Sequence, residues 1–172
     1  KSFSVDEALI LGIMRAESRF FKEAISPVGA RGLMQIMPYT ATHLARLLED
    51  DDFDEAQLLE PEVNIRYGSR YLARLGKKFD SIIPLVAAGY NAGPHRVYSW
   101  LNSFGSLNLD EFIEHIPFLE TRNYVKKVLR HYYVYKHLYK PESDLSLAWV
   151  TQKIPLKVSS NPSPRESWGA LE

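Results

Sequence analysis

The sequence predicts an all-α domain that is followed by an extended C-terminal tail. Apolar residues recur at intervals of three and four positions through most of the first 140 residues, and strand-like alternation is scarce. From Pro141 onward the periodicity is lost, and four of the ten prolines lie in this last stretch. We therefore place a helical domain at residues 1–140 and a Pro/Ser-rich tail at residues 141–172. We expect the tail to pack on the domain through Trp149, Ile154 and Leu156.

A capping pattern and three prolines indicate where the helices begin. Ser4 and Glu7 have the spacing of a capping box, in which a hydroxyl and a carboxylate satisfy free backbone N–H groups. Pro38, Pro61 and Pro84 suit the first turns of three further helices. Apolar spacing predicts two more helices, whose inward residues are Val97, Trp100, Leu101 and Phe104 in one, and Val125, Val128, Leu129, Tyr132, Tyr135 and Tyr139 in the other.

Composition limits the classes of partner and cofactor. The 172 residues carry 21 basic and 21 acidic side chains, so net charge gives no attraction to nucleic acid, and we expect no nucleic-acid partner. No apolar run approaches the roughly 20 residues of a membrane-spanning helix. The chain has no cysteine, and its five histidines show no metal-ligand spacing supported by a carboxylate. We therefore expect neither a metal nor a cofactor, and we expect a monomer.

The first predicted helix contains one residue that departs from its apolar stripe. Ile10, Ile13 and Met14 form this stripe, and Glu17 occupies its next position. Burial disfavours the charged form of a carboxyl group and raises its pKa, as a general acid near neutral pH requires. Alternatively, Glu17 ends the helix facing solvent or pairs with a neighbouring arginine. The helical pattern alone leaves both interpretations open.

Two further segments combine small residues with isolated polar side chains. Residues 26–38 contain two glycines and carry Gln35 as a lone amide between apolar neighbours. Residues 87–93 read Ala-Ala-Gly-Tyr-Asn-Ala-Gly, so that Tyr90 and Asn91 are the polar projections. Each segment alone is explained by close packing of helices, because small residues allow backbones to approach. Both segments together with the acid of the first helix are harder to explain by packing alone.

These motifs resemble the catalytic domain of the soluble lytic transglycosylases, the goose-lysozyme-like family that cleaves peptidoglycan glycan strands. The three family signatures are similar to Glu17-Ser18, to Gly32-Leu33-Met34-Gln35 and to Ala88-Gly89-Tyr90-Asn91-Ala92-Gly93. A fourth match, residues 116–125, resembles the segment that closes the domain in the larger soluble members. The matches extend from about Ala8 to Tyr139 in family order. The resemblance implies a lysozyme-like helical domain with a substrate cleft.

The resemblance also implies a reaction with one catalytic carboxyl group. Glu17 would protonate the oxygen that joins N-acetylmuramic acid to N-acetylglucosamine, and would then take a proton from the muramyl 6-hydroxyl. The product is a 1,6-anhydromuramyl end, formed without water. The resemblance implies that the Tyr90 hydroxyl points at Glu17 and the reacting acetamido group, and that Ser18 orients the Glu17 carboxylate.

Further positions match the family's substrate-binding residues. The full set implied by the resemblance is Ser18, Ser26, Gln35, Met37, Asn91, Glu120 and Tyr124. Gln35 is expected to hydrogen-bond the sugar and Met37 to line the cleft, whereas Asn91 holds the surrounding loop. Glu120 has an equal alternative role near a helix N-terminus, where the helix dipole favours an acid.

Two alternative functions remain open. A true muramidase on the same fold would use a water positioned by a second acid, such as Glu114 or Glu120. A non-catalytic module would bind the cell wall through the same cleft. All three interpretations have peptidoglycan glycan strands as the partner and place the protein in the bacterial cell envelope, in the periplasm, with its signal sequence outside this chain.

Overall fold

The computed structural model describes residues 3–142, 151–154 and 168. The described part is helical and contains no strand, which confirms the predicted all-α class. Its elements, in chain order, are α1 (Glu7–Glu17), α2 (Pro38–Leu48), the 3₁₀ helix η1 (Glu55–Leu59), α3 (Pro61–Lys78), α4 (Ile83–Ala92), α5 (Pro94–Phe104), α6 (Leu109–His115) and α7 (Leu119–Tyr139).

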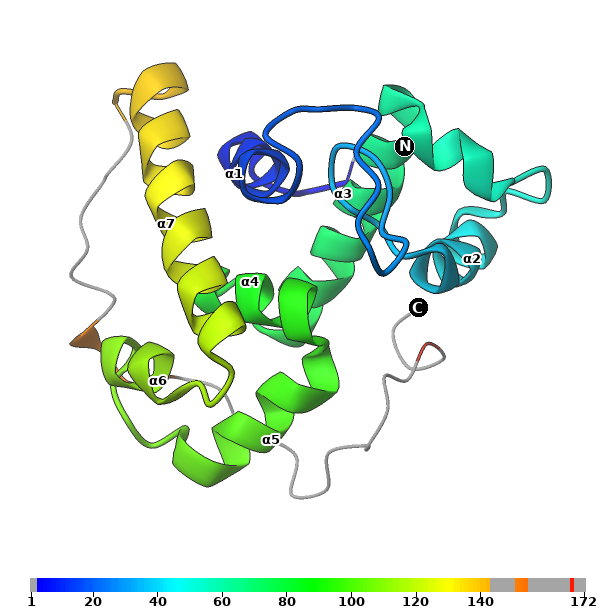
Figure 1. The fold of residues 1–172 in the computed structure, drawn as a ribbon. Helices are drawn as coiled ribbons and strands as arrows, with labels where there is room; N and C mark the ends of the chain where they lie inside the picture. The colour runs from blue at the N-terminus through cyan, green and yellow to red at the C-terminus, as the bar shows by residue number, and fades with distance from the viewer. Residues whose placement is uncertain (1–2, 143–150, 155–167, 169–172) are drawn as a thin grey trace.

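Helices α1, α4 and α7 form the centre of the domain. Helix α7 packs against both α1 and α4, while α3 and α5 also pack against α4 (Figure 1). Helices α2 and α3 lie on the other side of α1 from α7. The largest fully buried apolar side chains come from most of these elements and include Ile13, Met34, Leu44, Tyr67, Leu72, Leu75, Phe79, Leu85, Phe112 and Ile116. One continuous core therefore holds α1, which ends in Glu17.

Helices α1 and α7 run antiparallel and are joined at both ends by polar contacts. At the start of α1, the Asp6 carboxylate accepts hydrogen bonds from Lys136 Nζ at 2.6 Å and from the Tyr132 hydroxyl at 3.3 Å. At its end, Lys127 Nζ donates to the Ala16 carbonyl at 2.6 Å. A lysine suits this place because the C-terminal carbonyls of a helix lack partners and carry partial negative charge. These contacts fix the end of α1 against α7.

Helix starts predicted from proline are confirmed, whereas the predicted first cap is wrong. Pro38, Pro61 and Pro84 each occupy the first turn of a helix, because their missing N–H groups would have no helical partner there. The cap of α1 is Asp6, whose carboxylate accepts from the Ala8 backbone N–H at 3.0 Å, and not Ser4. Ser4 and Asp6 both have the short polar side chain that a cap needs, so the sequence does not decide which of these two positions begins the helix.

Three other details differ from the sequence prediction. Helix α6 and η1 were not predicted, because each is too short to show a periodic apolar stripe. Tyr139 was assigned to the inward face of the last helix but is 68% exposed, because α7 extends beyond the start of α1.

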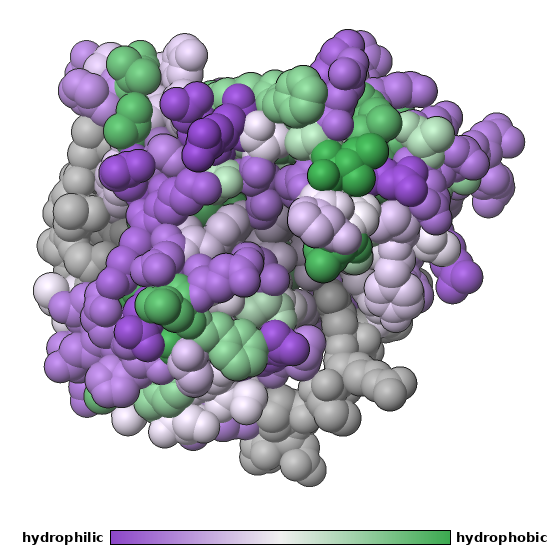
Figure 2. All heavy atoms as spheres, in the orientation of Figure 1, coloured by the Kyte–Doolittle hydropathy of each residue, from purple (hydrophilic) through white to green (hydrophobic). Residues whose placement is uncertain are grey.

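The face shown in Figure 2 is mainly hydrophilic, with hydrophobic side chains in separate patches.

Parts of the C-terminal region contact the helical domain. Ile154 is buried, as predicted, and the Leu109 backbone N–H donates to the Gln152 carbonyl at 3.0 Å. Trp149 and Leu156, the other two predicted anchors, lie outside the described residues. Trp168 packs on side chains of α2 and α3. The C-terminal region therefore contacts the domain near α6 and again near α2.

Candidate active site

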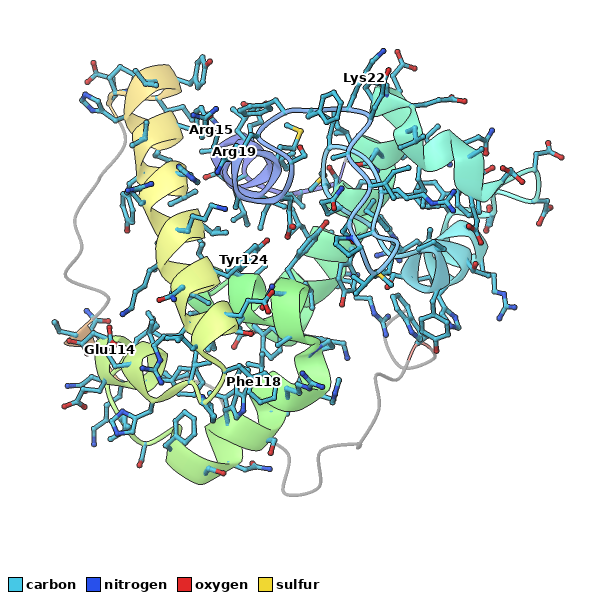
Figure 3. The ribbon with its side chains drawn as sticks, viewed as in Figure 1. Arg15, Arg19, Lys22, Glu114, Phe118 and Tyr124 are labelled. Atoms are coloured by element: carbon cyan, nitrogen blue, oxygen red, sulfur yellow. The ribbon has the colours of Figure 1, made fainter. Side chains whose placement is uncertain are left out.

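Glu17 is the last residue of α1 and lies partly buried beside α7. Its Oε1 atom accepts a hydrogen bond of 2.6 Å from the hydroxyl of Tyr124, which is buried on α7. Figure 3 shows Tyr124 pointing from α7 toward the interior beneath α1. The contact joins two residues 107 positions apart in the sequence. The alternative in which Glu17 faces solvent or pairs with a neighbouring arginine is therefore wrong.

Burial raises the pKa of Glu17 from its usual 4.5 to about 7. Two neighbours act in the opposite direction, because the hydrogen bond from Tyr124 and the positive charge of Lys127 both favour the carboxylate. The negative charge of Glu120 raises the pKa further. The position of Glu17 at the C-terminal end of α1 acts in the same direction, since this end of the helix dipole is negative. Glu17 can therefore hold and release a proton near neutral pH.

The loop that contains the Gly32-Leu33-Met34 motif is fixed by side-chain hydrogen bonds to its backbone. Ser18 Oγ donates to the Leu33 carbonyl at 2.7 Å, and the Tyr90 hydroxyl donates to the Met34 carbonyl at 2.8 Å. Both side chains thus bind the loop, in contrast to the expected contacts with Glu17. The tyrosine that donates to the Glu17 carboxyl group is Tyr124, for which only a sugar contact was predicted. Tyr90 is still near enough for the charge of Glu17 to raise the pKa of its hydroxyl, after the larger effect of burial.

Asn64 is a central residue of this loop that sequence reasoning missed. Its side chain is fully buried, accepts from the Met34 backbone N–H at 2.7 Å, and donates to the carbonyls of Arg31 and Leu58 at 2.9 and 2.7 Å. A Cβ atom at Gly32, where φ is +76°, would collide with the Asn64 amide and the Leu58 carbonyl. The available signal was its position one turn before the apolar stripe of α3, where a buried amide needs several partners.

Gln35 and Ser26 shape the same region through contacts with the backbone. Gln35 has a left-handed φ of +48°, and its Nε2 donates to the carbonyls of Ala24 and Gly32 at 3.0 and 2.9 Å. Ser26 closes a turn, since its Oγ accepts from the Ala30 backbone N–H at 3.0 Å. The Gln35 amide nitrogen thus binds the backbone of the loop. The expected contacts of Gln35 and Ser26 with a sugar stay predictions.

A hollow of about 240 Å³ lies between this loop, α3 and the end of α4. Its lining residues are Gln35, Ile36, Met37, Thr40, Tyr71, Tyr90, Asn91, Ala92 and Gly93. Four of the predicted site residues therefore share one hollow, in which amide and aromatic side chains face each other. Tyr71 was not predicted; it is almost buried, and its ring lies 5.4 Å from that of Tyr90. Such surfaces suit sugars, because flat rings contact pyranose faces and amides hydrogen-bond their substituents.

Residues in the first turn of α7 interact both with Asn91, which lines the hollow, and with Glu17. Thr121 is buried, and its hydroxyl donates to the Asn91 side-chain oxygen at 2.6 Å, which joins α7 to the end of α4. Glu120, one residue earlier, is exposed in the first turn of α7. Glu114 lies on α6, away from Tyr124 in Figure 3, and pairs with Lys126. Of the two candidate second acids, Glu120 is the one whose charge acts on Glu17.

Within the described residues no group of three His, Asp or Glu side chains could hold a metal ion. A helical domain with one partly buried acid next to a hollow lined by amide and aromatic groups belongs to the class of lysozyme-like helical domains.

Comparison with family models identifies the family within this class. Residues 1–113 match the transglycosylase SLT domain, and residues 115–143 match the soluble lytic transglycosylase helical domain. The first match covers more than half of the chain. This protein therefore belongs to the transglycosylase SLT domain family, as the sequence motifs indicated.

Curated relatives and solved structures agree with this assignment. The soluble lytic murein transglycosylase of Salmonella typhimurium is 45% identical over 135 residues, which cover 77% of this chain and 21% of the relative. The membrane-bound lytic murein transglycosylase C of Actinobacillus pleuropneumoniae is 32% identical, with coverage of 80% and 44%. This chain spans about a fifth of the length of the first curated relatives.

The structural similarity extends over most of the described chain. The 70 kDa soluble lytic transglycosylase from Escherichia coli matches with a TM-score of 0.76 at 42% identity, over 80% of this chain and 22% of that one. A complex of the 70-kDa soluble lytic transglycosylase with bulgecin A matches with a TM-score of 0.79 at 38% identity, over 87% and 25%. These matches confirm the lysozyme-like helical fold.

Proposed function

We propose that this domain cleaves the β-1,4 bond between N-acetylmuramic acid and N-acetylglucosamine in peptidoglycan and leaves a 1,6-anhydromuramyl end. The observation that carries the proposal is Glu17, a partly buried carboxyl group with a pKa of about 7 and a 2.6 Å hydrogen bond from Tyr124. Membership of the transglycosylase family supports the same reaction.

Glu17 acts first as the general acid. At pH 7 about half of the molecules carry its proton, given a pKa near this value. Because Oε1 accepts from Tyr124, the transferable proton resides on Oε2. Transfer to the glycosidic oxygen lets the bond to C1 of N-acetylmuramic acid break, and the N-acetylglucosamine leaves as an alcohol.

The resulting carboxylate then acts as the general base. The Tyr124 hydroxyl and the Lys127 charge stabilise it, since both favour the ionised form. The substrate's own 2-acetamido group stabilises C1 in place of a second protein carboxylate. Glu17 removes the proton of the muramyl 6-hydroxyl, whose oxygen closes on C1, so the original proton balance returns and no water is consumed.

The hollow next to Glu17 is proposed to bind the sugar on one side of the cleaved bond. Gln35, Met37, Tyr90 and Asn91 line it and offer amide, thioether and phenol groups. Ser18 and Ser26 support the binding loop through its backbone. Glu120 and Tyr124 are proposed to contact the muramyl sugar from the start of α7, Tyr124 in addition to its contact with Glu17.

Product analysis tests this reaction. Purified sacculi are digested with the protein, and the released fragments are analysed by mass. Fragments with 1,6-anhydromuramyl ends support the proposal, whereas only reducing ends would establish hydrolysis, for which Glu120 is the candidate second acid. The Glu17→Gln variant is the control, and loss of lysis with binding retained supports the role of Glu17. If the parent and the variant bind glycan equally and neither releases fragments, the site is a wall-binding module.

The biological setting is also part of the proposal. We infer that residues 1–140 form the catalytic domain, that the protein acts as a monomer, and that it works in the periplasm. None of the described helices is long and apolar enough to cross a membrane. Sedimentation of a dimer, or recovery of the native protein only from the cytoplasmic fraction, would contradict these expectations.

A further inference from the structure

Trp168 joins the C-terminal region to helices α2 and α3. Its indole stacks on the His43 ring of α2, with centroids 4.8 Å apart and planes 8° apart. It also lies 5.9 Å from the Tyr71 ring of α3, and the Arg74 guanidinium carbon is 4.9 Å from the indole centroid. Figure 1 shows the short segment at residue 168 next to α2. The indole therefore bridges two helices that are adjacent to the hollow.

Tyr71 connects Trp168 to the candidate active site. Its ring lines the hollow, packs 5.4 Å from Tyr90, and is only 7% exposed. The stack continues outward from His43 to Tyr39, whose rings are 4.6 Å apart in an edge-to-face arrangement. Tyr39 is 67% exposed. The aromatic row Tyr39–His43–Trp168–Tyr71–Tyr90 thus extends from the surface to the wall of the hollow.

Trp168 supports this wall and does not fill the hollow. The indole is absent from the residues that line the 240 Å³ space, which stays open with Trp168 in place. Of the side chains that it contacts, Tyr71 lines the hollow, whereas His43 and Arg74 do not. An inhibitory plug would instead contact Glu17, Tyr124 or the loop at Gln35.

We propose that Trp168 is a positioning residue for glycan binding, which stacks on His43 and thereby holds Tyr71 in place on one side of the sugar cleft. The inference rests on the proposed function and adds a residue from the C-terminal region to its binding site. Aromatic contacts and a cation–π contact together hold the wall, so their loss weakens the binding of glycan more than the chemical step.

The docked position of Trp168 can be observed directly. A stacked indole shifts the ring-proton NMR signals of His43 upfield through its ring current. We expect this shift in the parent and its loss in Trp168→Ala. Identical His43 signals in the two proteins would overturn the proposal, because the stack would then not exist in solution.

Kinetics on glycan oligosaccharides of defined length, prepared from sacculi, test the functional part. Trp168→Ala is expected to raise KM roughly tenfold while kcat changes less than twofold. Trp168→Phe keeps an aromatic ring without the indole N–H and should restore KM to near the parent value. Tyr139→Ala removes an exposed aromatic ring at the far end of α7 and is the matched control, with KM unchanged. Thermal unfolding of each variant verifies that it is folded.

A second variant makes the result independent of one substitution. His43→Ala should raise KM in a similar way, and combining it with Trp168→Ala should add little, since both changes break one stack. An unchanged KM in Trp168→Ala overturns the inference. A lower KM does so as well, because it would mean that Trp168 obstructs glycan binding in the parent. A parent that binds the oligosaccharide without cleaving it contradicts the proposed function alone, and the same comparison is then made on Kd. A parent that neither binds nor cleaves overturns both.

Discussion

Replacing Glu17 with glutamine is expected to stabilise the folded protein at neutral and alkaline pH. The amide has nearly the same shape as the acid, can accept the hydrogen bond from Tyr124, and cannot ionise. In the parent, the raised pKa of Glu17 means that the folded state resists the loss of this proton. The substitution removes the free-energy cost of ionising a buried carboxyl group. It should also abolish lysis, because stability and activity often oppose each other at an active site.

The magnitude follows from the pKa shift of Glu17. The folded pKa is about 7 and the ordinary value is 4.5, and each pH unit corresponds to about 1.4 kcal/mol. Between these values the folded state binds more protons than the unfolded state, so the stability of the parent falls as pH rises from 4.5 to 7. The full cost, about 3 kcal/mol, is present above pH 7. Below pH 4.5 the Glu17 carboxyl group is protonated in both the folded and the unfolded states. The parent and Glu17→Gln should therefore be equally stable there.

Urea unfolding at several pH values between 4 and 8 measures this difference. Glu17→Gln should match the parent at pH 4 and exceed its free energy of unfolding by up to about 3 kcal/mol at pH 8, or about 6–12 °C in Tm. The control Glu23→Gln, at an exposed residue, should differ little from the parent at any pH. A Glu17→Gln difference that does not vary with pH, or that has the opposite sign at pH 8, would refute the reasoning.

Three further predictions concern Tyr124, Asn64 and Tyr90. Tyr124→Phe removes a hydrogen bond that favours the carboxylate, so the Glu17 pKa rises and the alkaline limb of the kcat/KM profile moves to higher pH; an unmoved limb contradicts this role. Asn64→Ala removes three hydrogen bonds, one of them from the buried Met34 backbone N–H, and should cost about 4 kcal/mol in urea unfolding, with exposed Asn123→Ala as a near-neutral control. Tyr90→Phe removes the hydrogen bond to the Met34 carbonyl and should cost about 2 kcal/mol; an unaltered unfolding midpoint would show that this bond contributes nothing.

The helical fold could be predicted because its signals are local. Prolines in the first turns of α2, α3 and α4 have no N–H to lose, and the stripes of α3 and α7 show the helical period over many residues. Helix α6 has only seven residues, which is too few for such a pattern. The choice of Asp6 over Ser4 as the cap depends on where α7 places Lys136, which sequence spacing does not reveal.

Glu17 and the residues of the three motifs in the candidate site were predictable, whereas Asn64, Tyr71 and the contacts between the side chains were not. Glu17 was found because a carboxyl group on an apolar stripe conflicts with its surroundings. Its partner could not be found in the same way, because Tyr124 and Tyr90 are both tyrosines with a hydroxyl inside the domain, and only the tertiary arrangement decides which one reaches the carboxyl group. Ser18 is adjacent to Glu17 in sequence, yet its hydroxyl turns to the Leu33 carbonyl. Trp168 has no local signal at all, since its partners lie on α2 and α3.

Titration of the Glu17 carboxyl carbon by ¹³C NMR tests the central claim most directly. The other glutamates provide internal reference signals, and the Glu17→Gln variant assigns the resonance. Burial against α7 predicts a midpoint near pH 7. A midpoint near 4.5 would mean that the side chain is solvated and ionised at neutral pH, and Glu17 could then not donate the proton on which the proposed reaction depends.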